Sequence, residues 1–209
     1  MCLANRLPHG PEFIVMLMRI LPPQAIREAY DNDQAATCVL LCKNWLRDNP
    51  DDLSVIHDYA TMLYKMTRFD EAMSVYDDAL ARFPDNRWGI YNQIGHLNRY
   101  RGLLPEAEHA YQQAMESNPD EATSYIFLGA VQARQGKLIE AEKTHRLATL
   151  CQEGFIDEAY HNLGLVLCGQ GRLAEAKECF EKAIEIDNDY AHAIEALKDV
   201  TTAIEIDAE

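Results

Sequence analysis

The stretch "YNQIGHLNRYRGLLPEAEHAYQQAM", residues 91–115, places Gly95 inside what otherwise has the apolar spacing of a helix. A glycine inside a helix costs about 1 kcal/mol relative to alanine. The glycine recurs as Gly129 and Gly164, after intervals of 34 and 35 residues, and Ala60 stands 35 residues before Gly95. A destabilising residue that returns at a fixed interval indicates a repeated structural unit.

Further residue types recur with the same interval, and their agreement excludes chance. Alanine occupies two positions of the unit, an aromatic residue or its replacement occupies a third, and glycine or threonine occupies a fourth. These positions hold Ala72, Ala107, Ala141 and Ala176; Ala79, Ala114, Ala148 and Ala183; Tyr76, Tyr111, His145 and Phe180; and Thr67, Gly102, Gly136 and Gly171. Each unit has the apolar spacing of two amphipathic helices of about 14 residues.

The residue types predict how the two helices of a unit pack. A glycine after the first helix, such as Gly102, supplies the left-handed turn that ends it. We expect Gly95, inside the first helix, to meet the small residue Ala107 of the second, because helix backbones approach closely only where neither carries a bulky side chain. The aromatic residue, here Tyr111, then fills the space that opens further along. Proline follows the second helix at Pro84 and Pro119, where it stops a helix without breaking it.

This pattern resembles the tetratricopeptide repeat family, whose motif is W-x2-L-G-x2-Y, A-x3-F, P. The matching residues are Tyr91, Ile94, Gly95, Ala107, Tyr111 and Pro119; Tyr125, Leu128, Gly129, Ala141 and His145; Tyr160, Leu163, Gly164, Ala176 and Phe180; and, more weakly, Ile56, Tyr59, Ala60, Ala72, Tyr76 and Pro84. His145 departs from the motif in place of the aromatic, and Glu153 and Asn188 stand where proline is usual. The resemblance covers residues 53–188 and implies an all-α, right-handed superhelical solenoid of helix-turn-helix repeats.

The expected organisation is four repeats, at about 53–87, 88–121, 122–156 and 157–190, preceded by a degenerate half-repeat at 32–52. Residues 189–209 predict a C-terminal capping helix and an acidic tail, because the outer face of a last repeat would otherwise expose apolar surface. Residues 1–31 form an N-terminal segment. Its apolar stretch, residues 13–18, leaves three readings open: a helical plug of the solenoid end, a partner or dimer contact, or a stretch upstream of a true start at Met16 or Met18.

Composition limits the partners. The 209 residues include 34 Asp and Glu against 19 Lys and Arg, a formal net charge of −15. Such a chain repels phosphate backbones, which argues against nucleic acid as its main partner. The longest apolar run, residues 13–18, is too short for a membrane span and is interrupted by Arg19, which also argues against a signal peptide. We therefore expect a cytoplasmic protein.

Motifs for chemistry are missing from the sequence. It contains no GxGxxG, P-loop, HExxH or GxSxG element. Cys38 and Cys42 lie four residues apart on a predicted helix without further metal ligands nearby, which favours core packing over a metal site. His57, His96 and His161 are dispersed over three repeats. We predict no catalytic residue, no metal and no cofactor. For His145, a buried packing role is favoured over a polar site.

The family resemblance places a partner-binding groove on the concave surface, lined by the first helix of each repeat. The residues that map to it are poor in carboxylates although the chain is acidic. They are His57, Thr61, Tyr64, Lys65, Asn92, Gln93, His96, Arg99, Tyr100, Ile126, Phe127, Arg134, His161 and Asn162. Some members of the family clamp the C-terminal carboxylate of chaperones with Lys, Asn and Arg. Here the corresponding positions hold His57 with Thr61, Gln93, and Thr123 with Phe127, so that clamp is not supported.

The leading hypothesis is a non-enzymatic interaction scaffold that holds a peptide or helical segment of a partner protein. Amide side chains can pair with the backbone of such a segment, and Arg99 and Arg134 can meet its acidic or carboxylate groups. The alternative is a self-assembling structural protein, a homo-oligomer joined through the N-terminal apolar segment or through a solenoid end.

Overall fold

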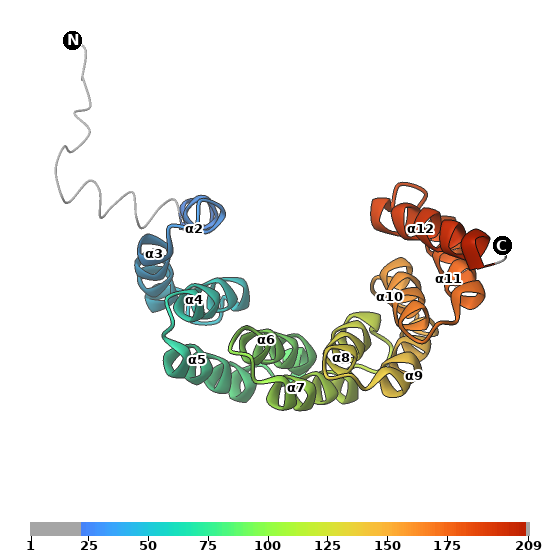
Figure 1. The fold of residues 1–209 in the computed structure, drawn as a ribbon. Helices are drawn as coiled ribbons and strands as arrows, with labels where there is room; N and C mark the ends of the chain where they lie inside the picture. Colours follow the sequence, from blue (N-terminus) through green and yellow to red (C-terminus); the bar gives the residue numbers. More distant parts are fainter. Residues whose placement is uncertain (1–21, 208–209) are drawn as a thin grey trace, which may run out of the picture. The chain divides into compact units, whose positions relative to one another are not determined.

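The computed structural model describes residues 22–207, which form eleven α-helices and one short 3-10 helix without a β-strand (Figure 1). The all-α fold of consecutive helix pairs predicted from the sequence is confirmed. The apolar stretch at 13–18 lies outside the described residues, so its three readings stay predictions. The chain divides into two compact units, unit 1 up to Pro84 and unit 2 from Asp85.

The helices of each unit follow one another with short connections. Unit 1 contains α2 (Pro22–Asp31), α3 (Ala35–Asp48), α4 (Leu53–Lys65) and α5 (Phe69–Arg82), and a 3-10 helix spans Pro84–Asn86. Unit 2 contains α6 (Arg87–Tyr100), α7 (Leu104–Ser117), α8 (Ala122–Arg134), α9 (Leu138–Ala148), α10 (Ile156–Gly169), α11 (Leu173–Ile186) and α12 (Ala191–Asp207).

A left-handed residue joins the two helices of every pair. Its φ is 78° at Gly102, 78° at Gly136 and 76° at Gly171, which confirms the predicted turn. Thr67, with φ 62°, and Asp33, with φ 54°, take the same conformation at the same interval without being glycine. The turn at Asp33 shows that α2 and α3 also form a pair. The helix α3, expected as a half-repeat, therefore has a first helix of its own.

In α6, α8 and α10, the glycine inside the first helix lies against the aromatic ring of the second helix. A Cβ added to Gly129 would lie 2.6 Å from the ring of His145, and a Cβ added to Gly164 would lie 2.5 Å from that of Phe180. Gly95 faces the ring of Tyr111 in the same way. Our expectation that the glycine meets the small alanine is therefore wrong. A ring can lie this close to a helix backbone only where the residue beneath it is small, and glycine leaves the most room, although Ala60 stands in this position in α4.

In the pair formed by α2 and α3, the large residue stands in the first helix and the small residue in the second. Ile26 stands 34 residues before Ala60, in the glycine position, and Cys42 stands 34 residues before Tyr76, in the aromatic position. Ile26 is 2% exposed and Cys42 is fully buried. The bulky side chain has moved from the second helix to the first. Burial raises the pKa of the Cys38 and Cys42 thiols, as expected for core cysteines.

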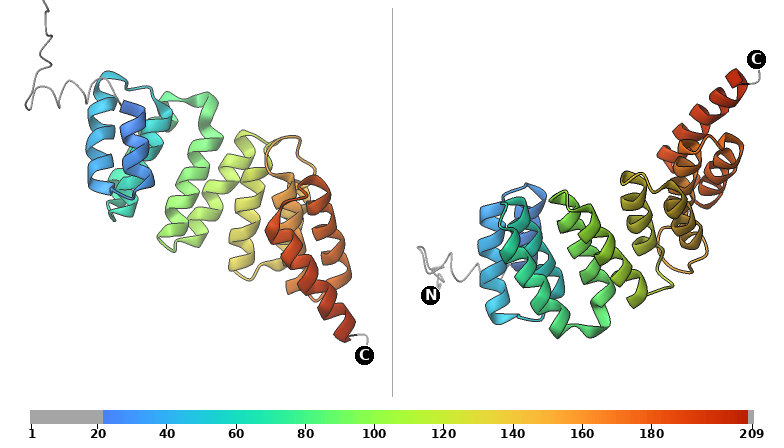
Figure 2. Two further views of the ribbon diagram at one scale, coloured as in Figure 1. Left: turned by 90° about the horizontal axis from the view of Figure 1, so that it is seen from above. Right: turned by 60° about the horizontal axis from the view of Figure 1, so that its bottom comes forward.

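In unit 2 the first helices and the second helices lie on opposite sides of a curved array. Helices α6, α8 and α10 line its inner side and α7, α9 and α11 its outer side (Figure 1). Two further views show the helices of unit 2 following one another along the array (Figure 2). We call these sides the inner face and the outer face. Successive helices joined by short turns run antiparallel, so α6, α8 and α10 run parallel to one another.

Helix α12 closes the C-terminal end of unit 2. Its Val200 is buried in one cluster with Leu163 and Leu167 of α10 and Phe180 of α11. Its opposite side exposes Glu195, Lys198 and other polar residues, as predicted for a capping helix. Helix α12 is the longest described helix, with 17 residues, and no helix within 22–207 is long and apolar enough to cross a bilayer.

Candidate functional site

Acidic residues are distributed unevenly between the two kinds of helix. The first helices α4, α6, α8 and α10 contain one, none, none and two Asp or Glu residues. The second helices α5, α7, α9 and α11 contain four, three, two and four. The inner face contributed by α6 and α8 is thus free of carboxylates in a chain that carries 34 of them.

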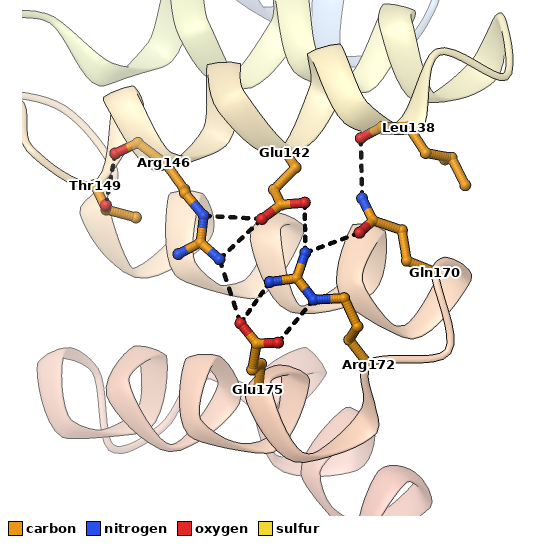
Figure 3. Close-up of polar contacts among 7 residues, drawn as sticks. All are labelled: Leu138, Glu142, Arg146, Thr149, Gln170, Arg172 and Glu175. Carbon is orange, nitrogen blue, oxygen red and sulfur yellow. Dashed lines mark hydrogen bonds and ion pairs between the residues drawn. The ribbon is translucent and has the colours of Figure 1, made fainter.

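On the outer face, carboxylates are engaged in ion pairs that join consecutive repeats. Glu142 of α9 accepts from Arg172, at the start of α11, over 2.7 Å and also pairs with Arg146 (Figure 3). Arg172 and Arg146 both reach Glu175 as well. One repeat earlier, Lys137 meets Glu108 of α7 over 2.8 Å.

These ion pairs between repeats recur at the repeat interval. The cations directly follow the left-handed Gly136 and Gly171, and the two acids are 34 residues apart. Partial burial alone would raise the pKa of Glu108 and that of Glu142. Hydrogen bonds from Lys137 and from Arg172, respectively, outweigh it, so both pKa values are lowered.

Three of the predicted groove residues are buried and belong to the packing. Thr61, Asn92 and Ile126 are 3%, 3% and 2% exposed. Asn92 donates from Nδ2 to Ser124 Oγ of the neighbouring first helix over 3.0 Å, and Ile126 lies in a cluster with Ala148 and Ala159. Their place on the binding surface is a wrong prediction: Asn92 and Ile126 lie on a side of the first helix that faces the next repeat, and Thr61 is buried in unit 1.

The predicted histidines are also engaged within the fold. Each places its Nδ1 near a tyrosine hydroxyl. The pairs are His57 with Tyr76 at 3.5 Å, His96 with Tyr111 at 3.0 Å and His161 with Tyr190 at 3.3 Å. Burial lowers the pKa of His57, and burial together with His192 lowers that of His161. Among residues 22–207, no three His, Cys, Asp or Glu side chains are grouped so that they could hold a metal ion.

Two further candidate residues, Tyr64 and Lys65, lie at the end of α4 in unit 1. Tyr64 is half-buried, while Lys65 is exposed at the end of α4. The Lys65 ammonium is already occupied, since it pairs with Asp33 over 2.8 Å and lies 5.4 Å from the centre of the Tyr30 ring. Lys65 therefore offers less free charge to a partner than the sequence suggests.

The other candidates lie on α6, α8 and α10, the helices of the inner face of unit 2. Arg99 and Tyr100 at the end of α6 and Arg134 at the end of α8 are exposed, and Tyr100 is 58% exposed. Arg99 and Arg134 form no ion pair with any of residues 22–207. Gln93, His96, Phe127, His161 and Asn162 are half-buried. Phe127 packs edge-on against His96, with ring centres 4.4 Å apart.

A loop that the repeat pattern did not predict fastens the third repeat to the second. Helix α9 has 11 residues, against 14 in α7 and α11, and the loop that follows it pairs with the loop before α8. Ala122 N donates to Glu153 O over 3.0 Å, and Glu153 N donates to Asp120 O over 3.1 Å. Gly154, with φ 90°, lies directly against the Glu121 carboxylate that caps α8. The departure from proline at Glu153 was the one signal for this loop.

Comparisons with known proteins agree with the register derived above. Family models described as tetratricopeptide repeat match residues 92–149 and 157–190. These segments contain three of the helix pairs described here. The chain is a tetratricopeptide repeat protein.

Two human proteins are similar in sequence to part of this chain. Protein O-mannosyl-transferase TMTC2 is 29% identical over 92 residues, which is 43% of this chain and 11% of TMTC2. Tetratricopeptide repeat protein 7A is 30% identical over 128 residues, 61% of this chain and 15% of that protein. This tetratricopeptide repeat chain thus corresponds to a small part of either relative.

Solved structures with the same fold include TTC0263, a thermophilic protein of Thermus thermophilus, with a TM-score of 0.63 and 21% identity over 87% of this chain and 97% of TTC0263. Another is the first repeat domain of Spaghetti (RPAP3) bound to the HSP90 peptide SRMEEVD. It has a TM-score of 0.54 and 21% identity over 58% of this chain and 95% of that one. At this identity the likeness establishes the tetratricopeptide repeat fold alone.

Proposed function

We propose that this protein is a non-enzymatic scaffold that holds an acidic segment of a partner protein on the inner face of unit 2. The observation that carries the proposal is the charge of that face. Helices α6 and α8 contain no acidic residue, and the two arginines at their ends have no ion pair within residues 22–207.

Electrostatics directs an acidic partner to this face. A chain with a net charge of −15 repels a negatively charged segment over most of its surface. The ends of α6 and α8 are an exception, because Arg99 and Arg134 have no neighbouring carboxylate in their own helices. Charge complementarity of this kind sets the orientation and the association rate of a complex more than its affinity.

A catalytic role has less support. The transferase activity named for TMTC2 belongs to a protein of which this chain matches 11%. His57, His96 and His161 lie on three different helices and are held by tyrosine hydroxyls, so they do not converge on a common reacting centre.

Peptide binding has a precedent in the fold, since the RPAP3 domain was solved with an HSP90 peptide. The mode proposed here differs from the carboxylate clamp of the family. Thr123 and Phe127 stand where that clamp has cations, and the charges of the inner face lie at Arg99 and Arg134 instead.

Site-specific photo-crosslinking tests the location. A benzoylphenylalanine in place of Tyr100 on the inner face should crosslink to a partner protein in a lysate of the source cells. The same residue in place of Lys143, exposed on the outer face, is the matched control. Crosslinking from position 143 but not from position 100 would contradict the proposal.

Self-assembly is the second candidate, and the end of the solenoid supports it. Helix α12 exposes Ile194 and Ile206, which are 46% and 68% accessible. An apolar end of this kind can contact a second copy. Light scattering over a wide range of concentration separates the two functions, because a stable monomer at micromolar concentration excludes assembly.

A further inference from the structure

We infer that the partner segment is extended and carries an anionic side chain and an apolar side chain three residues apart, the anion between Arg99 and Arg134 and the apolar side chain against Phe127. This inference rests on the proposed function and specifies the ligand of the same face.

The spacing follows from helix α8. Phe127 and Arg134 are seven residues apart, which is about two turns, so they lie on the same side of α8 with an axial separation of roughly 10.5 Å. An extended chain rises about 3.3 Å per residue, so three residues span this distance. A side chain bound at Phe127 and another bound at Arg134 are therefore separated by three positions.

Small residues keep the surface between these two points open. Ala130 lies between Phe127 and Arg134 on the same side of α8 and is partly exposed. In the repeat register, Ala130 corresponds to His96 of α6 and to Leu165 of α10, both larger. A partner backbone can thus approach α8 at Ala130 more closely than it can approach either neighbouring helix.

Helix α6 brings the second arginine to the same end. Contact between His96 and Phe127 aligns α6 with α8, and Arg99 follows His96 by about one turn in the direction in which Arg134 follows Phe127. Arg99 is three residues beyond this contact and Arg134 is seven, so Arg134 lies roughly 6 Å further along the helix axes. The axes of neighbouring helices are about 8–10 Å apart, and two long arginine side chains can span both separations. Two guanidinium groups can then share one carboxylate or phosphate through charge-assisted hydrogen bonds.

Buried contacts hold this arrangement before any ligand arrives. Phe127 contacts both His96 and Tyr111, with ring centres 4.4 and 5.5 Å away. The Tyr111 hydroxyl fixes His96 through Nδ1. The buried hydrogen bond from Asn92 to Ser124 joins α6 to α8 at the other end. A surface held in this way loses little entropy on binding.

Fluorescence anisotropy with labelled synthetic peptides of about a dozen residues tests the spacing. One peptide carries Glu and Leu three positions apart, a second has them five apart, a third has Gln in place of Glu, and a fourth has phosphoserine in place of Glu. We expect the three-residue spacing to bind about fivefold more tightly than the five-residue spacing and about tenfold more tightly than the Gln peptide. The phosphoserine peptide shows whether a phosphate or a carboxylate is preferred.

Protein variants separate this inference from the proposed function. Ala130→Leu keeps both arginines but fills the surface between them and Phe127, so it should weaken the three-residue peptide about fivefold. Ala174→Leu, at an exposed position of α11, should leave it unchanged. Equal affinity for both spacings, with binding that still depends on Arg99 and Arg134, overturns the inference and leaves the function standing. Binding that ignores both arginines overturns both, and no binding by any peptide at about 1 mM overturns the inference.

Discussion

The outer and inner faces of unit 2 use the same residue type in two ways. On the outer face, Arg172 lies between Glu142 and Glu175 and joins consecutive repeats (Figure 3). On the inner face, Arg99 and Arg134 are exposed and form no ion pair within residues 22–207. Stacking of the repeats thus explains the positions of Glu108 and Glu142 and of the cations that pair with them, whereas no contact within the described residues explains Arg99 and Arg134.

The absence of acids from α6 and α8 also has a cost. A carboxylate in the first turn stabilises a helix by about 0.3–1 kcal/mol through the helix dipole. Helices α5, α7, α9, α10 and α11 each carry at least one there, whereas α2, α3, α4 and α12 carry none. Helices α6 and α8 contain no acidic residue, although the Glu121 carboxylate caps α8. Helix α6 therefore gains no such stabilisation, and its composition fits the proposed anionic partner.

The largest effect is expected where the two faces meet, beneath the aromatic rings. Gly129→Leu places a side chain where His145 lies and should lower the free energy of unfolding by about 3 kcal/mol. Urea denaturation measures this loss. Gly89, where an added Cβ meets nothing within 4 Å, is the control, and Gly89→Ala should be neutral or stabilising. Equal stability of the two variants would mean that the ring contact is wrong.

A smaller effect concerns pH. Burial lowers the pKa of His145 to about 4, while the unfolded residue titrates near 6.5. Between these values only the unfolded state gains the proton. Stability therefore falls as the pH drops from about 6.5 towards 4, by on the order of 1–3 kcal/mol. His145→Phe, which copies Phe180 one repeat later, should remove this part of the loss.

Thermal unfolding at pH 7.5 and pH 5 measures this difference for the parent and the His145→Phe variant. The reciprocal change Phe180→His should add a loss of the same sign. His57 and His161, whose pKa values are also lowered, leave a residual pH dependence in both proteins. A pH dependence that His145→Phe does not alter would show that this histidine is protonated in the folded state.

The ion pairs of the outer face should contribute less. Glu142→Gln breaks the contacts with Arg146 and Arg172 and should lower the Tm by roughly 2–4 °C at low salt. The difference should shrink in high salt because salt screens these pairs. Glu140→Gln, an exposed change on the same helix, is the control and should have no effect. The same loss in both variants would leave the network without a role in stability.

The helix pairs and their register were predictable from the sequence because small and aromatic residues recur at fixed positions. The partner of Gly95 was not predictable, since Ala107 and Tyr111 lie one turn apart on the same side of the second helix. The site was predictable only in part. Arg99 and Arg134 are exposed, as a surface site requires, whereas Asn92 and Ile126 face the next repeat. Spacing along one helix does not show which neighbouring helix covers it.

The outer ion pairs did have a signal in the sequence. Glu108 and Glu142 keep the repeat interval, as the cations after Gly136 and Gly171 do. Pairing them requires knowing which helices become neighbours, so this signal becomes useful once the stacking is known.

The central claim is that the inner face of unit 2 binds an acidic partner segment. The most direct test is the affinity of the crosslinked partner, measured by titration calorimetry at several salt concentrations, for the parent and for the variant Arg99→Ala with Arg134→Ala. Removing two exposed arginines should leave the fold and its stability unchanged. We predict a binding free energy that is less favourable by about 1–3 kcal/mol and a flatter salt dependence. Lys143→Ala with Lys182→Ala removes the same charge from the outer face and should change neither. Unchanged affinity and salt dependence in the arginine variant would contradict the account.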